Sequence, residues 1–210
     1  MIKTIVAEDN LYMQNHFVNM LLADGAFELV GAFADAFEAE KACENADVDL
    51  VLMDVQTAHN HSGVSAGARI RKNSGAKVVI VTSLIDPDVL ARSKNGGADS
   101  LWYKDHGDTE LIDVIKRTVA GEHIFPDMSP SVELNEMFSC ELSPRQLQIL
   151  RRFVQGETYD EIAESLGITK SGVRWNLEQI VMKGGFKNKH ELIAAVIESK
   201  LIVTTLKDEI

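Results

Sequence analysis

Strand-like and helix-like segments alternate five times along the first 120 residues, and this alternation restricts the possible folds more than any other feature. Short apolar runs predict strands, and each is followed by a segment with helical spacing. In the first of these segments Phe17, Leu21 and Leu22 are expected on one face, and Asp35 is the expected N-cap of the second. The predicted strands cover residues 3–8, 27–33, 49–54, 77–83 and 99–104, and the predicted helices cover residues 11–24, 35–46, 63–73, 86–96 and 108–121. Repeated strand–helix units indicate a doubly wound, five-stranded parallel sheet, which we expect to form an α/β domain over residues 1–121.

The remainder of the chain has a different pattern. Residues 122–141 contain two prolines and no sustained period, which predicts a linker with a short helix at residues 131–138. Beyond it, three helical segments begin at Ser143, Thr158 and Thr169, which can act as N-caps, and a fourth segment is amphipathic. These segments cover residues 143–156, 158–167, 169–185 and 188–200. We therefore expect a small all-α, four-helix domain over residues 142–203, with residues 204–210 as a C-terminal tail.

Composition narrows the class of protein further. The chain is 45% hydrophobic, and none of its apolar runs approaches the length of a membrane span. It begins without a signal-peptide pattern, and its two cysteines form no CxxC motif, which fits a reducing compartment. We expect a cytoplasmic protein with no membrane partner. The formal net charge of −11 disfavours nucleic acid overall, but residues 141–210 carry 10 Lys+Arg and 10 Asp+Glu, a net charge of zero.

The ends of the predicted strands carry side chains suited to phosphoryl chemistry. Strand one ends in Glu8 and Asp9, strand three in Asp54, strand four in Thr82 and strand five in Lys104. Strand ends of a parallel sheet meet at one edge, so these side chains should converge. Three carboxylates need a cation, and Mg²⁺ prefers oxygen ligands, while Lys104 and Thr82 can hold phosphate oxygens. A single acid at a strand end is ordinarily an exposed loop residue, but five matched positions favour a common site.

With these five positions, residues 1–121 resemble the flavodoxin-like receiver domain of bacterial two-component response regulators. The resemblance implies that Asp54 accepts a phosphoryl group from a sensor histidine kinase, with Mg²⁺ as cofactor. It implies magnesium ligands from Glu8, Asp9, Asp54 and the backbone carbonyl of Gln56, and phosphoryl contacts from Thr82 and Lys104. Autophosphorylation and autodephosphorylation are the only catalysis it implies, so the protein is not expected to be an enzyme in the ordinary sense.

The loop after Asp54 departs from the receiver pattern. Thr57 and Ala58 stand where a Met-Pro pair is usual, and Gly63 comes one residue late. Leu101 occupies the position of the aromatic switch residue that works with the mobile threonine, here Thr82. These departures affect the expected lifetime of a phosphate on Asp54 and the coupling between threonine and switch residue.

The same loop carries His59 and His61, for which three interpretations are open. Two imidazoles at this spacing could share a transition metal, but a structural zinc site needs four ligands and the sequence shows no further His or Cys nearby. An exposed polar loop is the favoured interpretation. A histidine that senses pH or tunes phosphate hydrolysis beside Asp54 is the third.

Residues 158–180 have the form of a helix-turn-helix, with a short helix ending at Gly167 and a second helix starting near Lys170. Residues 142–198 resemble the NarL/LuxR (FixJ) type of DNA-binding domain, which implies double-stranded DNA as partner and a homodimer on activation. The expected DNA-contacting residues are Lys170, Ser171, Arg174, Trp175, Glu178, Lys183, Lys187 and Lys189.

Both domains together predict a DNA-binding response regulator whose phosphorylation switches dimerisation and transcription. The alternative is a phosphorylation-independent regulator whose receiver only dimerises or binds proteins, although the five retained strand-end residues argue against it. A metabolic enzyme on the same kind of sheet would need a glycine-rich phosphate loop after the first strand, and residues 8–14 contain no glycine.

Overall fold

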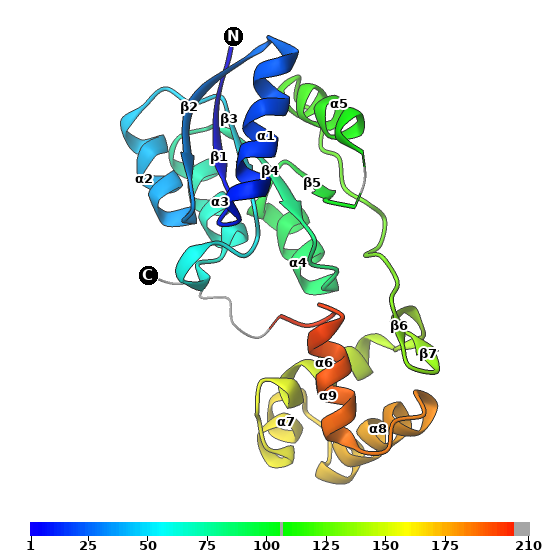
Figure 1. The fold of residues 1–210 in the computed structure, drawn as a ribbon. Helices are drawn as coiled ribbons and strands as arrows, with labels where there is room; N and C mark the ends of the chain where they lie inside the picture. Colours follow the sequence, from blue (N-terminus) through cyan, green and yellow to red (C-terminus); the bar gives the residue numbers. More distant parts are fainter. Residues whose placement is uncertain (106, 204–210) are drawn as a thin grey trace. The chain divides into compact units, whose positions relative to one another are not determined.

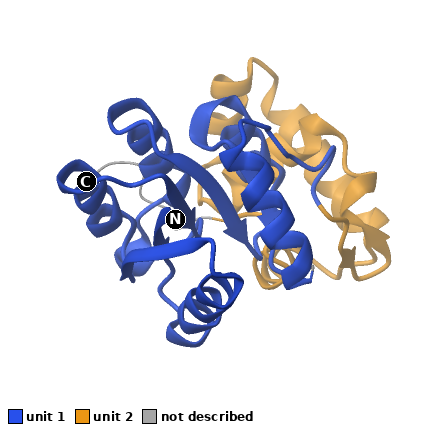
Figure 2. Cartoon of the chain, turned by 90° about the horizontal axis from the view of Figure 1, so that it is seen from above, with its two compact units in different colours: residues 1–129, 205–210 blue, residues 130–204 orange. Residues whose placement is uncertain are grey.

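The computed structural model describes residues 1–105 and 107–203 (Figure 1). The chain divides into two compact units, one formed by Met1–Ser129 and one that begins at Pro130 (Figure 2). The predicted tail at residues 204–210 lies outside the described residues. None of the helices in the described part of the chain combines the length and apolar character that crossing a bilayer requires.

The first unit contains the predicted five-stranded sheet. All neighbouring strands are parallel, and their order is β2-β1-β3-β4-β5. The strands are β1 (Ile2–Ala7), β2 (Phe27–Phe33), β3 (Leu50–Met53), β4 (Lys77–Thr82) and β5 (Ser100–Tyr103). Ala7 pairs with Met53, and Thr82 pairs with Tyr103. This register brings the residues that follow β1, β3 and β5 to the same edge of the sheet.

Helices cover both faces of this sheet, as the alternating pattern predicts (Figure 1). On one face lie α1 (Leu11–Asp24) and α5 (Asp108–Val119), whose Phe17, Leu21, Leu111 and Ile115 pack on a shared core with alternate strand residues. Leu22, which we expected on the same face of α1 as Phe17, is 49% exposed, so that expectation is wrong.

The other face of the sheet carries α2 (Ala36–Asn45), α3 (Gly63–Asn73) and α4 (Pro87–Arg92). The predicted helix start at Asp86 and Pro87 is confirmed, because Asp86 caps α4 and Pro87 occupies its first turn. The helix itself is shorter than predicted, because a π-helical turn over Ser93–Gly97 replaces its last turn.

The second unit begins with an element that the sequence did not predict. Residues 131–138 form a β-hairpin, β6 (Glu133–Leu134) and β7 (Met137–Phe138), so the expected short helix is wrong. Asn135 turns the chain with a left-handed backbone (φ 56°), and its side chain donates to the carbonyl of Gly184 at 2.7 Å. Leu134 and Met137 are each 1% exposed and belong to the core of the second unit.

After a 3-10 turn at Ser139–Glu141, four α-helices complete the described part of the second unit, in agreement with the predicted all-α domain. They are α6 (Pro144–Val154), α7 (Tyr159–Leu166), α8 (Lys170–Lys183) and α9 (Lys189–Glu198). Ser143, Thr158 and Thr169 cap α6, α7 and α8 as expected. Gly167 ends α7 in the left-handed region (φ 63°), where glycine meets no steric penalty. The chain can therefore turn sharply into α8, which produces the predicted helix-turn-helix.

Candidate functional site

Lys104 connects the acidic residues at the edge of the sheet. Its Nζ donates to Oε2 of Glu8 at 2.6 Å and to Oδ2 of Asp54 at 2.9 Å. The three side chains follow β5, β1 and β3, and all three are largely buried. Residues separated by as many as 96 positions in the sequence are thereby joined in one ion-paired cluster.

The predicted carboxylate cluster is also present. Glu8, Asp9 and Asp54 each offer an oxygen, and these oxygens lie within 4.8 Å of one another. Glu8 and Asp54 are buried, whereas Asp9 is exposed, so the cluster is accessible from the side of Asp9. A set of carboxylate oxygens with room for water suits a hard divalent cation such as Mg²⁺, so the residues present fit this ion.

The surroundings of Asp54 favour its neutral form. Burial raises the pKa of this carboxyl to about 7, and the charge of Glu8 also raises it. Lys104 and a hydrogen bond of 2.7 Å from the backbone N–H of Val55 act in the opposite direction but do not outweigh burial. For Lys104, burial lowers the pKa of the ammonium group, but Asp54 and Glu8 outweigh it and leave that pKa raised. The cluster therefore lacks positive charge, which a divalent cation would supply.

The other expected site residues lie on the neighbouring strands. Thr82 ends β4 and is fully buried, and its Oγ1 accepts a hydrogen bond from the backbone N–H of Leu84 at 3.0 Å. The Thr82 carbonyl accepts from the Lys104 N–H at 2.9 Å, so the two residues are neighbours across the sheet. Leu101 is buried in β5, and Gln56 pairs with Ser62 in an isolated bridge within the loop after β3.

The loop at residues 54–63 is held by hydrogen bonds within it and to the start of α2 rather than by a proline. The Thr57 hydroxyl accepts from the N–H of Ala36 at 3.1 Å and donates to the carbonyl of His61 at 2.9 Å. The Gly63 N–H donates to the carbonyl of Val55 at 2.9 Å, and a Cβ at Gly63 would overlap the Asp54 carbonyl oxygen. Thr57 therefore fixes the loop from the position where receivers usually have methionine.

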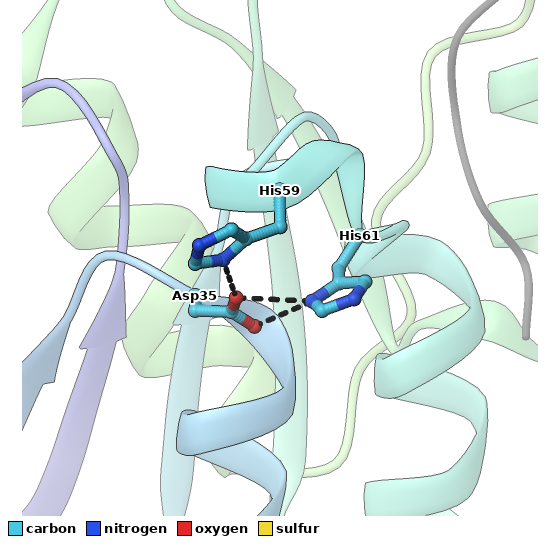
Figure 3. Close-up of side chains that lie close together, drawn as sticks. All are labelled: Asp35, His59 and His61. Atoms are coloured by element: carbon cyan, nitrogen blue, oxygen red, sulfur yellow. Dashed lines mark hydrogen bonds and ion pairs between the residues drawn. The ribbon is translucent and has the colours of Figure 1, made fainter. Parts of the chain in front are cut away.

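The two histidines of this loop converge on Asp35 (Figure 3). Nδ1 of His59 lies 2.7 Å from Asp35 Oδ2, and Nδ1 of His61 lies 2.8 Å from Oδ1 and 3.0 Å from Oδ2. The His61 side chain is only 20% exposed, so a simple exposed loop does not describe it. Sequence reasoning placed Asp35 as the N-cap of α2, which is confirmed, but did not connect it to the histidines. The sequence feature that could have indicated this contact is the position of Asp35 just after β2, because this strand ends at the same edge of the sheet as the strand before Asp54.

On α8, several of the side chains expected to contact DNA form ion pairs with nearby acids. Nε of Arg174 donates to Oε1 of Glu178 at 2.7 Å, one helical turn away. The others are Lys170 with Asp160 at 2.6 Å and Lys183 with Glu141 at 3.0 Å. These pairs are exposed, so each contributes little to stability and can open when a phosphate approaches.

The remaining expected contacts surround the same helix. Trp175 is 59% exposed, which is unusual for a tryptophan and consistent with a binding surface. The Ser171 hydroxyl lies 3.0 Å from that of Thr169, and Nζ of Lys189 lies 5.1 Å from the centre of the Tyr159 ring. Lys187 is exposed at the turn before α9, where its backbone N–H donates to Glu191.

Comparison with known proteins identifies the class of both units. Residues 4–116 match the response regulator receiver domain, and residues 141–196 match the bacterial regulatory proteins of the luxR family. The chain therefore belongs to the response regulators that join a receiver domain to a LuxR-type helix-turn-helix DNA-binding domain.

Among individual relatives, the chain is 28% identical over 215 residues to the oxygen regulatory protein NreC of Staphylococcus aureus (strain JH9), covering 95% of this chain and 99% of that protein. A solved structure of RcsB from Salmonella enterica serovar Typhimurium, bound to promoter rprA in the presence of phosphomimetic BeF₃⁻, has a TM-score of 0.61 at 19% identity and covers 93% of this chain and 98% of that one. A LuxR-family DNA-binding response regulator from Staphylococcus aureus has a TM-score of 0.54 at 24% identity, covering 57% and 99%. At these identities the two solved structures support the fold alone.

Proposed function

We propose that this response regulator is switched by phosphorylation of Asp54. The observation that carries the proposal is the contact of the Lys104 ammonium group with both Glu8 and Asp54, beside a third carboxylate at Asp9. This arrangement places a carboxylate nucleophile, a fixed positive charge and a set of oxygen ligands at one edge of the sheet.

In the phosphorylation step, an Asp54 carboxylate oxygen attacks the phosphorus of a phosphohistidine on a sensor histidine kinase. The phosphorus–nitrogen bond breaks, the imidazole leaves with the electron pair, and an acyl phosphate remains on Asp54. Lys104 donates to a phosphoryl oxygen, and Thr82 does so once its hydroxyl turns away from Leu84. Mg²⁺ held by Glu8, Asp9, Asp54 and the Gln56 carbonyl would neutralise charge on the carboxylates and the phosphoryl group.

The output is dimerisation and binding of double-stranded DNA. Movement of Thr82 toward the phosphate changes the surface formed by residues 84–104, and Leu101 follows this change by repacking, since it has no aromatic ring to rotate. The dimer then places α8 of each protomer in a major groove, where Arg174 is suited to a guanine edge. A protein of the same fold, RcsB, has been solved bound to promoter rprA in the presence of phosphomimetic BeF₃⁻, which supports DNA binding as the output of such a fold.

The test compares the full-length wild-type chain with Asp54→Asn, each with Mg²⁺ and beryllofluoride or acetyl phosphate. We expect the wild type to shift from monomer to dimer in sedimentation velocity and to bind promoter DNA roughly tenfold more tightly, because dimerisation makes the second half-site contact intramolecular. Asp54→Asn should show neither change. Glu44→Gln, which removes an exposed acid on α2, is the matched control and should behave as the wild type.

The proposal fails if beryllofluoride changes neither the assembly nor the DNA affinity of the wild type, or changes the Asp54→Asn protein equally. Either outcome would favour a phosphorylation-independent regulator whose receiver acts only as an interaction module. Mass spectrometry after acetyl phosphate treatment measures phosphorylation separately from dimerisation and DNA binding, since it detects the added phosphate directly.

A further inference from the structure

The cluster formed by Asp35, His59 and His61 is separate from the carboxylate site and has no part in the chemistry described above. Within residues 1–105 and 107–203, only this group and the Glu8–Asp9–Asp54 group bring three carboxylate, imidazole or thiol ligand atoms within 4.8 Å of one another. The carboxylate group offers oxygens alone, whereas this one offers two imidazole nitrogens and one carboxylate. Imidazole ligands suit zinc, copper, iron and nickel rather than magnesium.

The carboxylate at the centre of the cluster is fixed and ionised. Asp35 is buried and caps α2, where its Oδ1 accepts from the backbone N–H of Phe37 at 2.8 Å. Burial raises the pKa of Asp35, but the hydrogen bonds from His59, His61 and Phe37 outweigh it and hold that pKa below its usual value. A buried, ionised carboxylate that faces two imidazoles is pre-oriented for a cation.

The two imidazoles are also held in place. Thr57 fixes the backbone carbonyl of His61, and the Phe37 ring packs edge-on against the His61 ring with centroids 6.3 Å apart. His59 and Asn60 both adopt left-handed backbone conformations, with φ of 60° and 62°. This turn directs both Nδ1 atoms to the same carboxylate (Figure 3). No helix or strand spacing produces that convergence.

The distances allow an ion to replace the hydrogen bonds. The nitrogen–oxygen separations are 2.7 Å and 2.8 Å. Ligand atoms around a tetrahedral zinc ion lie about 3.4 Å apart, so each nitrogen and its partner oxygen need to separate by roughly 0.6 to 0.7 Å. Each Nδ1 carries a hydrogen while it donates to Asp35, and on metal binding that hydrogen moves to Nε2 of the same ring. The His59 side chain is 75% exposed, which leaves a side open for water as a fourth ligand.

An ordinary histidine–carboxylate pair is the simpler explanation of such contacts, and His16 with Asp108 provides a comparison. Nε2 of His16 lies 3.0 Å from Asp108, but both side chains are exposed and only one imidazole is present. The Asp35 cluster differs in having two imidazoles on one buried carboxylate, which is more than a single ion pair requires.

We propose that Asp35, His59 and His61 bind a divalent transition metal ion, Zn²⁺ or an ion of similar ligand preference, with water completing the coordination. A metal at this position ties the loop that follows Asp54 to the start of α2. The proposal stands apart from phosphorylation of Asp54, because it depends on none of the residues of the carboxylate cluster.

The experiment measures Zn²⁺ binding to the tag-free full-length chain by isothermal titration calorimetry. Saturating Mg²⁺ occupies the Glu8–Asp9–Asp54 cluster, and Cys140→Ser in every protein removes the exposed thiol. Asp35→Asn is the sharpest variant, since asparagine caps a helix as well as aspartate but lacks the charge. His61→Gln and the double variant His59→Gln/His61→Gln remove the imidazoles, and His16→Gln is the matched control. Circular dichroism verifies that each variant folds.

We expect one Zn²⁺ per chain for the background protein and for His16→Gln. The affinity should fall more than 100-fold in Asp35→Asn and in the double variant, beyond the roughly 10- to 100-fold cost of losing an outer-shell partner. With Co²⁺ as a second probe, the visible absorption of the background protein should disappear in the same variants. No saturable binding to the background protein, or equal binding by the folded double variant, would overturn the proposal.

Discussion

At the scale of single residues, the buried Asp54 should make the stability of the receiver depend on pH. Its pKa rises from a reference value of 3.8 to about 7 on folding, so the folded state holds the proton more tightly than the unfolded state. The associated stability is present below about pH 4 and is lost as the pH rises toward 7. Without divalent cations, we expect the free energy of unfolding to fall by as much as about 4 kcal/mol over this range.

Urea unfolding at several pH values tests this expectation. Trp102 lies in the receiver core, so a Trp175→Phe background makes its fluorescence specific for that unit. The difference between this background protein and the same protein with Asp54→Asn isolates one group from all others that titrate. Parallel pH dependences in the two proteins would show that Asp54 is not the group responsible. Added Mg²⁺ should weaken the pH dependence of stability in the protein that retains Asp54, because it stabilises the ionised form of this residue.

Thr57 is the second residue with a measurable role, because its hydroxyl is buried and joins the start of α2 to the loop after β3. Thr57→Val keeps the shape but leaves the Ala36 N–H without its acceptor, so we expect a loss of about 1–3 kcal/mol in the free energy of unfolding. Thr57→Ser keeps the hydroxyl and should lose only about 0.8 kcal/mol, the value of one buried carbon. Equal losses in the two variants would show that the hydroxyl does not hold the loop.

At the scale of elements, an ion pair on α8 restrains the side chain of Arg174, which is expected to contact DNA. Arg174 is paired with Glu178, whose negative charge also faces any approaching phosphate. Glu178→Gln should therefore raise the affinity for DNA roughly threefold, a small change because the pair is exposed. Fluorescence anisotropy on labelled duplex DNA at two salt concentrations measures it, and the gain should shrink at the higher salt.

Glu198→Gln provides the comparison for this variant, because it removes the same charge at the end of α9. A gain confined to Glu178→Gln would assign the effect to the neighbourhood of Arg174. A gain shared by both variants would instead assign it to the overall charge of the protein, and the Arg174–Glu178 contact would have no specific role.

The elements also show what local sequence determines. The strands, the helix order and the caps at Asp35, Ser143, Thr158 and Thr169 followed from periodicity and cap chemistry, because these signals act within a few residues. The hairpin at residues 133–138 could not be predicted in this way. Its strands have two residues each, and it depends on Asn135 reaching Gly184, 49 positions away. Gly184 itself, expected within the helix, is the C-cap of α8.

At the scale of the whole molecule, the candidate site was predictable where topology alone brings residues together. The ends of parallel strands meet at one edge, so the sequence alone is enough to group Glu8, Asp54 and Lys104. The convergence of His59 and His61 on Asp35 was not predictable, since it requires two consecutive left-handed residues in a loop. The directions of side chains along a strand alternate regularly, so they can be read from the sequence. On such a loop the directions depend on the particular hydrogen bonds that shape the backbone.

The hairpin formed by β6 and β7 also bears on how regulators of this design can be recombined. Leu134 and Met137 fill the core of the second unit, so a DNA-binding module excised after residue 141 would carry a hole where they belong. The side chains of Ser129 and Tyr103 still contact each other within the first unit. A chimera that exchanges receivers should therefore join its two parents between Ser129 and Pro130, because a junction there leaves both hydrophobic cores intact.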